Sequence, residues 1–419
     1  MSTTASARTP RRGRRARGRG GRDDREPLPR SAWTRLAACT AAAALLQLDG
    51  TVITVALPSV ARGLHVSSSA TATVLSAYFA AYAVLLFPGG RLVDRLGARR
   101  VALSGLAVFA VGAALGAVVS SLGLLIVTRV LQGAGAGLVS PAALAGAVSG
   151  FPADRRGAAL GIWGASAGAA NLVGPLLGGL LTVAFGWRAA WWALVPLALV
   201  AGWVVARYVP SIVHEVGEHG RRSVLNPTVV AAALTAALTF AVMIGSFYLA
   251  EQYLQRTVGY SALGASAVLV VVALLVGAAA PLAGGLVDRS GERVPALAGF
   301  LAAGIGLAIL SVPGVSLHGI GTGLALIPIG LGLGMLFVPT SRAALNATPV
   351  AAHGRASSVL SAARLLGAAV GAGLAGAALS GGPTASTMHL ALAVAAGVCL
   401  LLGIPAASRL GARAQPVLA

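Results

Sequence analysis

The sequence predicts an all-α polytopic membrane protein, and three observations lead to this fold class. Of its 419 residues, 57% are hydrophobic and only 10% are charged, whereas soluble domains carry about 25% charged residues. Apolar runs of about 20 residues, long enough to cross a ~30 Å hydrocarbon core as helices, recur along the chain. The alternation of apolar and polar residues that marks an outer-membrane barrel does not occur in the sequence.

Twelve membrane-spanning helices are expected, and short loops join most of them. The predicted spans are 36–61, 70–93, 101–120, 122–149, 157–184, 187–207, 228–250, 262–287, 294–314, 317–340, 356–380 and 387–407. The polar segment 208–227 divides the spans six and six. The sequence therefore predicts an N-terminal six-helix bundle at 36–207, a cytoplasmic linker at 208–227 and a C-terminal six-helix bundle at 228–407.

The N-terminal segment differs from the rest of the chain. Residues 1–35 hold Arg, Gly and Pro with almost nothing to bury, so we expect a disordered tail. A basic run fits either a nucleic-acid-binding arm or an anchor to anionic lipid at the cytoplasmic surface. We favour the lipid anchor and expect no nucleic-acid partner. A second cytoplasmic tail is expected at 408–419.

The distribution of arginine predicts that both termini lie inside the cell. In that orientation the inner side receives "RLVDRLGARR", "ADRRG", "VDRSGER" and "HGRASS" in addition to the basic tail. The outer loops receive only Arg62, Arg188 and Arg256. Because loops rich in basic residues stay in the cytoplasm, the asymmetry indicates an N-in and C-in topology.

A loop motif occurs once in each predicted half. "GRLVDRLGARR" begins at Gly90, after the second span, and "GGLVDRSGERV" begins at Gly284, after the eighth, 194 residues later. Two repeats in the same orientation imply an axis along the membrane normal. Transporters built in this way bind their substrates between the repeats, near the middle of the membrane.

Four stretches together resemble the major facilitator superfamily, and more narrowly its drug:proton antiporters of the subfamily that usually has fourteen spans. They are the loop at Gly90, "RVLQGAGAGLVSPAA" from Arg129, "GIWGASAGAANLVGPLLGG" from Gly161 and "LQLDGTVITVALPSV" from Leu46. "YLQRTVGYS" and "ASSVLSAARLLGAAVG" also look like that subfamily. The sequence departs from the pattern in having twelve spans, Thr54 in place of the usual asparagine, and Ala170 in place of a glycine.

The resemblance implies a major facilitator fold, a conformational latch in the repeated loop and a fifth span against which the halves rock. Glycines permit tight turns, and a carboxylate can accept hydrogen bonds from a helix N-terminus. Gly and Pro within a span kink it and admit a close neighbour. The latch residues are Gly90, Asp94, Arg95, Gly97, Arg99, Asp288 and Arg289, and the antiporter-helix residues are Gly174, Pro175, Gly178 and Gly179. Charges that only enforce topology, and ordinary packing of small residues, are the alternatives.

Asp49 lies in an otherwise apolar first span, where a charge costs at least ~2.5 kcal/mol. At 1.5 Å per residue it lies about 18 Å from the outer end of its span, and Arg129 lies about 10 Å from the outer end of the fourth span. Both are therefore within reach of each other or of one water network. We interpret Asp49 and Arg129 as the proton-coupling pair, because a carboxylate whose hydration changes can load and unload a proton. A pair that only orders the bundle is the alternative.

Glu251 is the only carboxylate at membrane level in the second bundle, beside Gln252 and Gln255. Contact with a cationic substrate, a second proton site, and a residue at the wet outer rim all fit the sequence. The residues expected around the substrate cavity are Tyr78, Tyr82, Gln132, Trp163, Asn171, Glu251 and Gln255. Arg364, in the eleventh span, receives no transport role.

These features favour a proton-coupled efflux antiporter of the plasma membrane that exports lipophilic drugs, antibiotics or toxic metabolites by alternating access. A proton symporter or facilitator of a small metabolite is the alternative, and a non-transport membrane protein is a third hypothesis. The sequence contains no catalytic triad, phosphate loop or metal-binding cluster, so we expect no enzyme activity, cofactor or metal. The expected partners are a lipophilic small molecule, protons and the bilayer, with the chain acting as a monomer.

Overall fold

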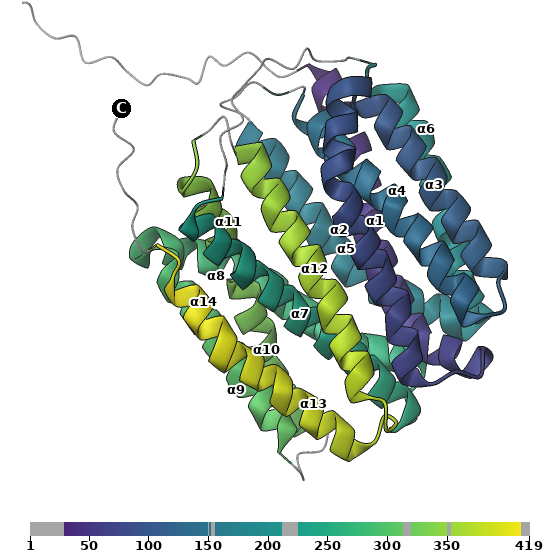
Figure 1. Ribbon diagram of the computed structural model, residues 1–419, viewed down its shortest axis with the longest axis vertical. Helices are drawn as coiled ribbons and strands as arrows, with labels where there is room; N and C mark the ends of the chain where they lie inside the picture. Colours follow the sequence, from purple (N-terminus) through teal and green to yellow (C-terminus); the bar gives the residue numbers. More distant parts are fainter. Residues whose placement is uncertain are drawn as a thin grey trace, which may run out of the picture.

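The computed structural model describes residues 29–149, 151, 156–211, 225–312, 320–349 and 353–411. Every regular element in these ranges is a helix, so the predicted all-helical membrane fold is confirmed (Figure 1). The first half contains α1 (Arg30–Gly63), α2 (Ser68–Leu96), α3 (Ala98–Val118), α4 (Leu122–Val148), α5 (Arg156–Phe185) and α6 (Arg188–Tyr208).

The second half contains six further spans, and two of them are interrupted. Its elements are α7 (Pro227–Arg256), α8 (Ala262–Ser290), α9 (Arg293–Ser311), α10 (Ile320–Met335), α11 (Phe337–Asn346), α12 (His353–Ala378), α13 (Ala385–Gly397), the π-helical η3 (Val398–Gly403) and α14 (Ile404–Ser408). Pro339 explains the first interruption, because its ring clashes with the carbonyl four residues earlier, which belongs to Met335 at the end of α10.

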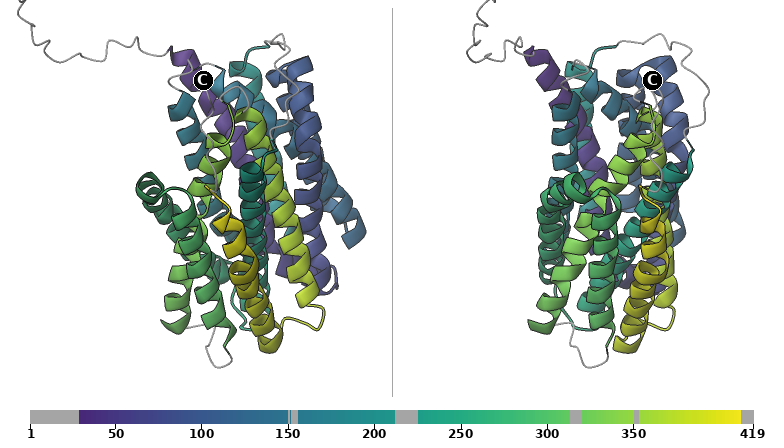
Figure 2. Two further views of the ribbon diagram at one scale, coloured as in Figure 1. Left: turned by 60° about the vertical axis from the view of Figure 1, so that its left-hand side comes forward. Right: turned by 90° about the vertical axis from the view of Figure 1, so that its left-hand side faces the viewer.

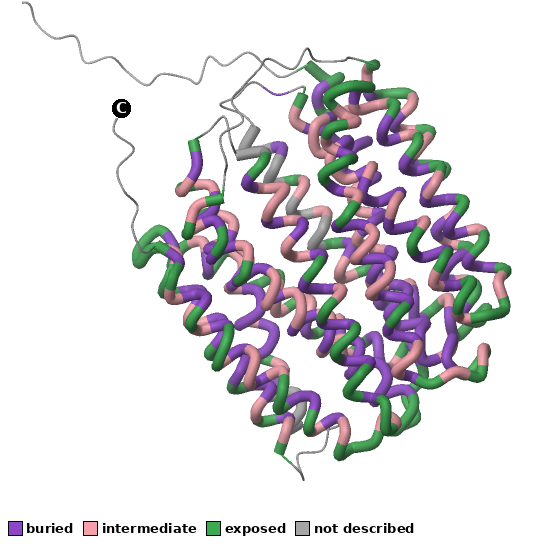
Figure 3. The backbone as a smooth tube through the Cα atoms, viewed as in Figure 1, coloured by how far each residue is buried: buried purple, intermediate pink, exposed green. Residues whose placement is uncertain are grey.

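Eleven spans in the described residues have the length and hydropathy to cross a membrane, with α10–α11 and α13–α14 counted as one each. In the remaining span, α5, the described apolar stretch is Ala169–Phe185. Exposed residues run along the length of the helices and are not confined to their ends (Figure 3). Many of them are large and apolar, including Val118, Leu180, Leu199 and Leu401. Such a surface suits lipid rather than water.

The two halves repeat the same packing order. In the first half α4 packs against α2 and α3, and α1 packs against α5 and α6. In the second half α10 packs against α8 and α9, and α7 packs against α12 and α13. The halves touch through α5 with α8 and through α2 with α12, which are equivalent pairs under the repeat. All the helices run roughly along the long axis of the molecule (Figure 2).

Hydrogen bonds between the halves gather towards one end of the bundle, where loops 64–67, 257–261 and 379–384 lie (at the bottom of Figure 1). We call it the sealed end. These bonds join Tyr248 to Ser68 and Thr71, Gln252 to Thr71, Gln255 to Val55, Arg256 to Ser68, and Ser76 to Ala369. Among the described residues, no hydrogen bond joins the halves at the opposite end.

The first span begins earlier than predicted. Residues 30–35, assigned to the disordered tail, form the first turns of α1. They are helical because Ala32 is buried and the Trp33 ring packs edge-on against Phe151, with centroids 5.3 Å apart. The rest of the predicted tail, most of the linker and most of the second tail, at 1–28, 212–224 and 412–419, lie outside the described residues.

Candidate functional site

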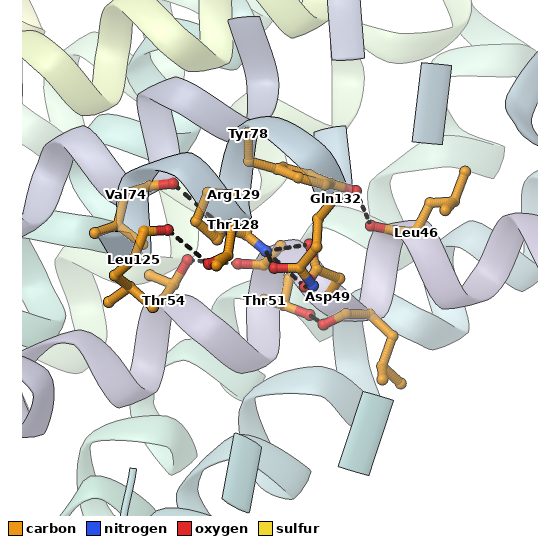
Figure 4. Close-up of polar contacts among 12 residues, drawn as sticks. Leu46, Asp49, Thr51, Thr54, Val74, Tyr78, Leu125, Thr128, Arg129 and Gln132 are labelled. Atoms are coloured by element: carbon orange, nitrogen blue, oxygen red, sulfur yellow. Dashed lines mark hydrogen bonds and ion pairs between the residues drawn. The ribbon is translucent and has the colours of Figure 1, made fainter. Parts of the chain in front are cut away.

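A buried ion pair lies within the first half (Figure 4). Arg129 Nη1, on α4, donates to both carboxylate oxygens of Asp49, on α1, at 2.8 Å each. Both side chains are 0% exposed. Since a buried carboxylate is stabilised only when it is paired and hydrogen-bonded, this contact explains how the first span tolerates Asp49.

Further side chains hold the pair in place. Gln132 follows Arg129 by almost one helical turn, so both face α1; its Oε1 accepts from Arg129 Nη1 at 3.0 Å, and its Nε2 donates to Asp49 Oδ1 at 3.3 Å. The Tyr78 ring lies 4.2 Å from the guanidinium carbon, within cation–π range. Arg129 Nη2 has no hydrogen-bond partner among the described residues. The pair is therefore nearly saturated but keeps one free donor.

The glycines of α5 allow helices of both halves to pack closely against it. A Cβ on Gly174 would lie 1.8 Å from Thr51 Oγ1, and one on Gly178 would lie 2.6 Å from the Val52 carbonyl oxygen; both neighbours are on α1. A Cβ on Gly179 would lie 2.6 Å from Ser266 Oγ on α8 of the other half. Through these glycines, with the buried Pro175 among them, α5 packs against both α1 and the second half.

Glu251 lies where the halves meet. Its side chain is 0% exposed, which excludes a position at a wet rim. Gln255 Nε2 donates to Glu251 Oε2 at 2.7 Å and also to the Val55 carbonyl of α1 at 3.0 Å. Glu251 Oε1 has no partner in the described part of the chain. The second buried carboxylate is therefore far less well satisfied than Asp49.

The residues expected around one substrate cavity divide into separate groups. Tyr78 and Gln132 belong to the Asp49 pair, and Glu251 and Gln255 belong to the interface cluster. Of the other three, Tyr82 is buried, while Trp163 and Asn171 are half-buried on α5. The hydroxyl of Tyr248, which was not among the expected site residues, hydrogen-bonds to Ser68 and Thr71 on α2 of the other half.

The first copy of the latch loop makes few contacts. Gly97 ends α2 with φ 83°, in the left-handed region that favours glycine, which accounts for the turn into α3. Asp94 is exposed and accepts no hydrogen bond from a described residue, so the expected bond to a helix N-terminus is not formed. Because Asp94 is exposed, no described side chain caps the N-terminus of α3. Arg99 Nη1 donates to Ser211 Oγ at 3.3 Å.

The second copy makes a more definite contact. Asp288 forms an ion pair with Arg342 on α11, and Glu292 Oε1 accepts from Asn346 Nδ2 at 2.8 Å. These contacts join the end of α8 and the residue that precedes α9 to α11, at the end of the tenth span. Of the other latch residues, Gly90 has open space beside it, and Arg95 and Arg289 are exposed and form no ion pair with a described residue.

Arg364, for which no transport role is expected, lies between aromatic rings of its own half. Its guanidinium carbon is 5.9 Å from the centroids of both Phe240 and Phe337, and its Nη2 donates to Ser341 Oγ at 2.8 Å. It has no carboxylate partner among the described residues. The hydroxyl of Ser341 and the ring faces stabilise the cation in this position.

A bundle of two similarly packed six-helix halves, with charged side chains buried between apolar spans, defines a polytopic membrane transporter fold. The chain matches the Major Facilitator Superfamily family model over residues 39–372, with a second match over 232–417. It belongs to this superfamily. It is therefore a multi-pass protein of the plasma membrane.

Relatives are transport and resistance proteins. The "Uncharacterized MFS-type transporter Rv1250" of Mycobacterium tuberculosis is 41% identical over 186 residues, covering 44% of this chain and 32% of that protein. The "Puromycin resistance protein pur8" of Streptomyces alboniger is 41% identical over 176 residues, covering 42% of this chain and 35% of that protein. The "Multidrug resistance protein Stp" of M. tuberculosis is 27% identical over 402 residues, covering 80% and 74%. The first two matches thus span about a third of each relative.

A solved structure has the same fold. The bacterial homologue of the human lysosomal transporter Spinster, in an inward-facing and unoccupied conformation, superposes with a TM-score of 0.73 at 17% identity. The superposition covers 91% of this chain and 98% of that one.

Proposed function

We propose that the protein is a proton-coupled antiporter that exports lipophilic drugs, antibiotics or toxic metabolites by alternating access. The observation that carries this proposal is the fully buried Asp49–Arg129 pair, because ionisable side chains at membrane depth mark ion and proton pathways. The relatives that confer resistance to puromycin or to several drugs favour this substrate class over a small nutrient.

The pair offers a route by which protonation can move the helices. While Asp49 is ionised, it accepts charge-assisted bonds from Arg129, which are stronger than neutral ones. Protonation removes the charge and leaves Arg129 as a buried cation without a counter-ion, so the pair must rearrange or hydrate. Asp49 is on α1, which packs on Gly174 and Gly178 of α5, and the next α5 residue, Gly179, touches α8. A shift of α1 therefore reaches the other half directly.

The proposal also covers the two halves, the substrate surface and the latch loops. Residues 36–207 and 228–407 move as two units about the linker 208–227, in a single chain that acts as a monomer. Tyr82, Trp163 and Asn171 contribute to the substrate surface. The loops that begin at Gly90 and Gly284 act as latches, and the Asp288–Arg342 pair supports this role for the second loop.

We also propose that the sealed end faces the outside, because the arginine-rich loops lie at the other end. Single cysteines introduced at 64–67 and 382–385, after replacement of the buried Cys39 and Cys399, should react with an impermeant maleimide in whole cells. Cysteines at 208–211 should react only after lysis. The reverse pattern would invert the topology.

The function is tested in inverted membrane vesicles that hold an acidic interior. Addition of an exported compound from a panel of antibiotics, puromycin included, should release protons from the lumen, because the antiporter exchanges the two. The Asp49→Asn variant at matched expression should release none. A symporter would not exchange added compound for lumenal protons, and a panel without any response would contradict efflux of this substrate class.

A further inference from the structure

The sealed end contains a carboxylate without a cation. Glu251, on α7, is 0% exposed and accepts one hydrogen bond, from Gln255 Nε2 at 2.7 Å. No ion pair involves it in the described part of the protein, and its Oε1 has no hydrogen-bond partner there. An ionised carboxylate in this position would carry its charge at membrane depth without a counter-ion, which is strongly unfavourable.

The neighbouring amides supply more acceptors than donors. Gln252 Nε2 donates to Thr71 Oγ1 at 3.2 Å, and Gln255 Nε2 is divided between Glu251 and the Val55 carbonyl. The Oε1 atoms of both glutamines are buried and have no partner among the described residues. Three buried acceptor oxygens on one turn of α7 therefore have no donor. A carboxylic acid, unlike a carboxylate, provides an O–H donor for such a group.

The other titratable groups at the sealed end do not replace the missing charge. They are Arg62 on α1, His65 in loop 64–67, Arg188 on α6, which donates to the Val119 carbonyl, Tyr248, Tyr253 and Arg256 on α7, Tyr260 in loop 257–261, and His389 on α13. Arg62 donates to Ser59, Arg256 donates to Ser68, and His389 meets the Leu310 carbonyl. At this end α2, α8 and α12 contribute no charged side chain among their described residues.

We propose that Glu251 is a second proton-binding site, protonated while the sealed end is closed and ionised when that end opens. Closure joins α7 to α1 and α2 through Gln255 and Gln252, and it excludes water from the carboxyl group. Opening breaks these bonds and hydrates Glu251, so the charged form becomes stable. Proton uptake from the outer medium therefore favours closure. The inference rests on the proposed alternating access, to which it adds the group that senses closure.

The test measures closure without any substrate. Spin labels at Val66→Cys and Tyr260→Cys, one in each half, report the distance across the sealed end of the purified protein in nanodiscs from pH 5 to pH 9. The wild type should change from a short to a long distance as pH rises, with one titrating proton changing the ratio by up to about tenfold per pH unit. Glu251→Gln, which mimics the neutral acid, should stay short throughout. Asp49→Asn, the comparison variant, should at most shift the midpoint through α1 and should keep the pH response, because Glu251 still titrates.

Three results would overturn the inference: a wild-type distance independent of pH, a Glu251→Gln variant that responds as the wild type does, or loss of the response in Asp49→Asn alone. Infrared spectra give a second readout in case Glu251→Gln does not fold. A protonated carboxyl band present at low pH should be displaced in Glu251→Asp and unchanged in Asp49→Asn; an undisplaced band would also overturn it. Neither readout involves export, so a protein that exports no drug yet keeps this response contradicts only the proposed function.

Discussion

Among the described residues, two carboxylates are buried within the spans, one in each half, and their surroundings differ. Asp49 lies inside the first half, where Arg129 contacts both of its oxygens and Gln132 adds a third bond. Glu251 lies between the halves, where Gln255 contacts one oxygen and nothing described contacts the other. The same chemical group is thus compensated by a cation at one site and left without compensation at the other.

Under the proposed alternating access, this difference assigns the two carboxylates different tasks in the transport cycle. A paired carboxylate inside a single bundle keeps its partners when the bundles rotate as units, so what changes its protonation is the arrival of substrate, protons or water. A carboxylate at the interface loses its partners whenever the halves separate. From this comparison we propose that Asp49 exchanges protons against substrate and that Glu251 links protonation to closure of the sealed end.

The largest expected effect comes from breaking the paired site. Arg129→Ala leaves a buried carboxylate without its cation, and the loss of one partner of such a pair costs about 3–5 kcal/mol. Thermal unfolding in detergent should show a clear fall in Tm. The double variant Asp49→Asn with Arg129→Gln should regain most of the stability but no export. Glu251→Gln is the control, because it keeps a neutral acceptor for Gln255 and should change stability by no more than about 1 kcal/mol.

If Arg129→Ala unfolded at the wild-type temperature, the ion pair would contribute little, and Asp49 would be as poorly compensated as Glu251. A double variant no more stable than Arg129→Ala would show instead that the position requires the arginine side chain for packing. Either outcome would remove the contrast between the two sites.

The sequence predicted one of these sites better than the other. Spans of about twenty apolar residues are a local property, and so is the cost of a charge within them, which is why the helices and the Asp49–Arg129 neighbourhood could be anticipated. The burial of Glu251 depends on how α7 docks against α1 and α2, and no pattern along α7 encodes that contact. Its neighbours Gln252 and Gln255 were the available signal, because amides beside a carboxylate indicate a buried polar cluster.

Two further differences between the predicted and the observed contacts also arise from how the helices pack against one another. The bond expected for Asp94 is not formed, whereas the equivalent Asp288 pairs with Arg342 on a different span. The two copies of the motif are similar in sequence, so their unequal contacts arise from tertiary structure. Similarly, the Tyr248 hydroxyl bonds to the other half only because α2 packs beside it, and the sequence of α7 does not reveal that packing.

An intermediate effect is expected at Gly179, which belongs to the interface and not to the Asp49 pair. A side chain there would meet Ser266 Oγ at 2.6 Å and the backbone Cα of Leu263 at 2.9 Å, and the backbone atom cannot rotate away. Gly179→Val should therefore push α5 from α8 and open the sealed end at low pH, at a cost of about 1–3 kcal/mol. Distance measurements across that end should show the longer population.

Gly277→Val is the matched control for this substitution. Gly277 also lies within a helix, α8, but has no neighbouring atom within 4 Å of an added Cβ. It should therefore keep the closed distance. Equal opening by both variants would trace the effect to helix propensity, and an unchanged Gly179→Val distance would show that α5 and α8 separate without opening the sealed end.

The smallest expected effect is at Tyr248, where one hydroxyl group can be removed without changing the packing. That hydroxyl donates to the Ser68 carbonyl and hydrogen-bonds with Thr71 Oγ1, both on α2, while the ring stays buried. A neutral hydrogen bond contributes about 0.5–1.5 kcal/mol, so Tyr248→Phe should lower the ratio of closed to open sealed end by roughly two- to tenfold. Because Glu251 keeps its place, the pH dependence of the spin-label distance should move to lower pH without losing its slope. A variant with a flattened slope would mean that Tyr248 itself carries part of the proton response, and the division between a paired proton site and an interfacial one would then have to include a phenol.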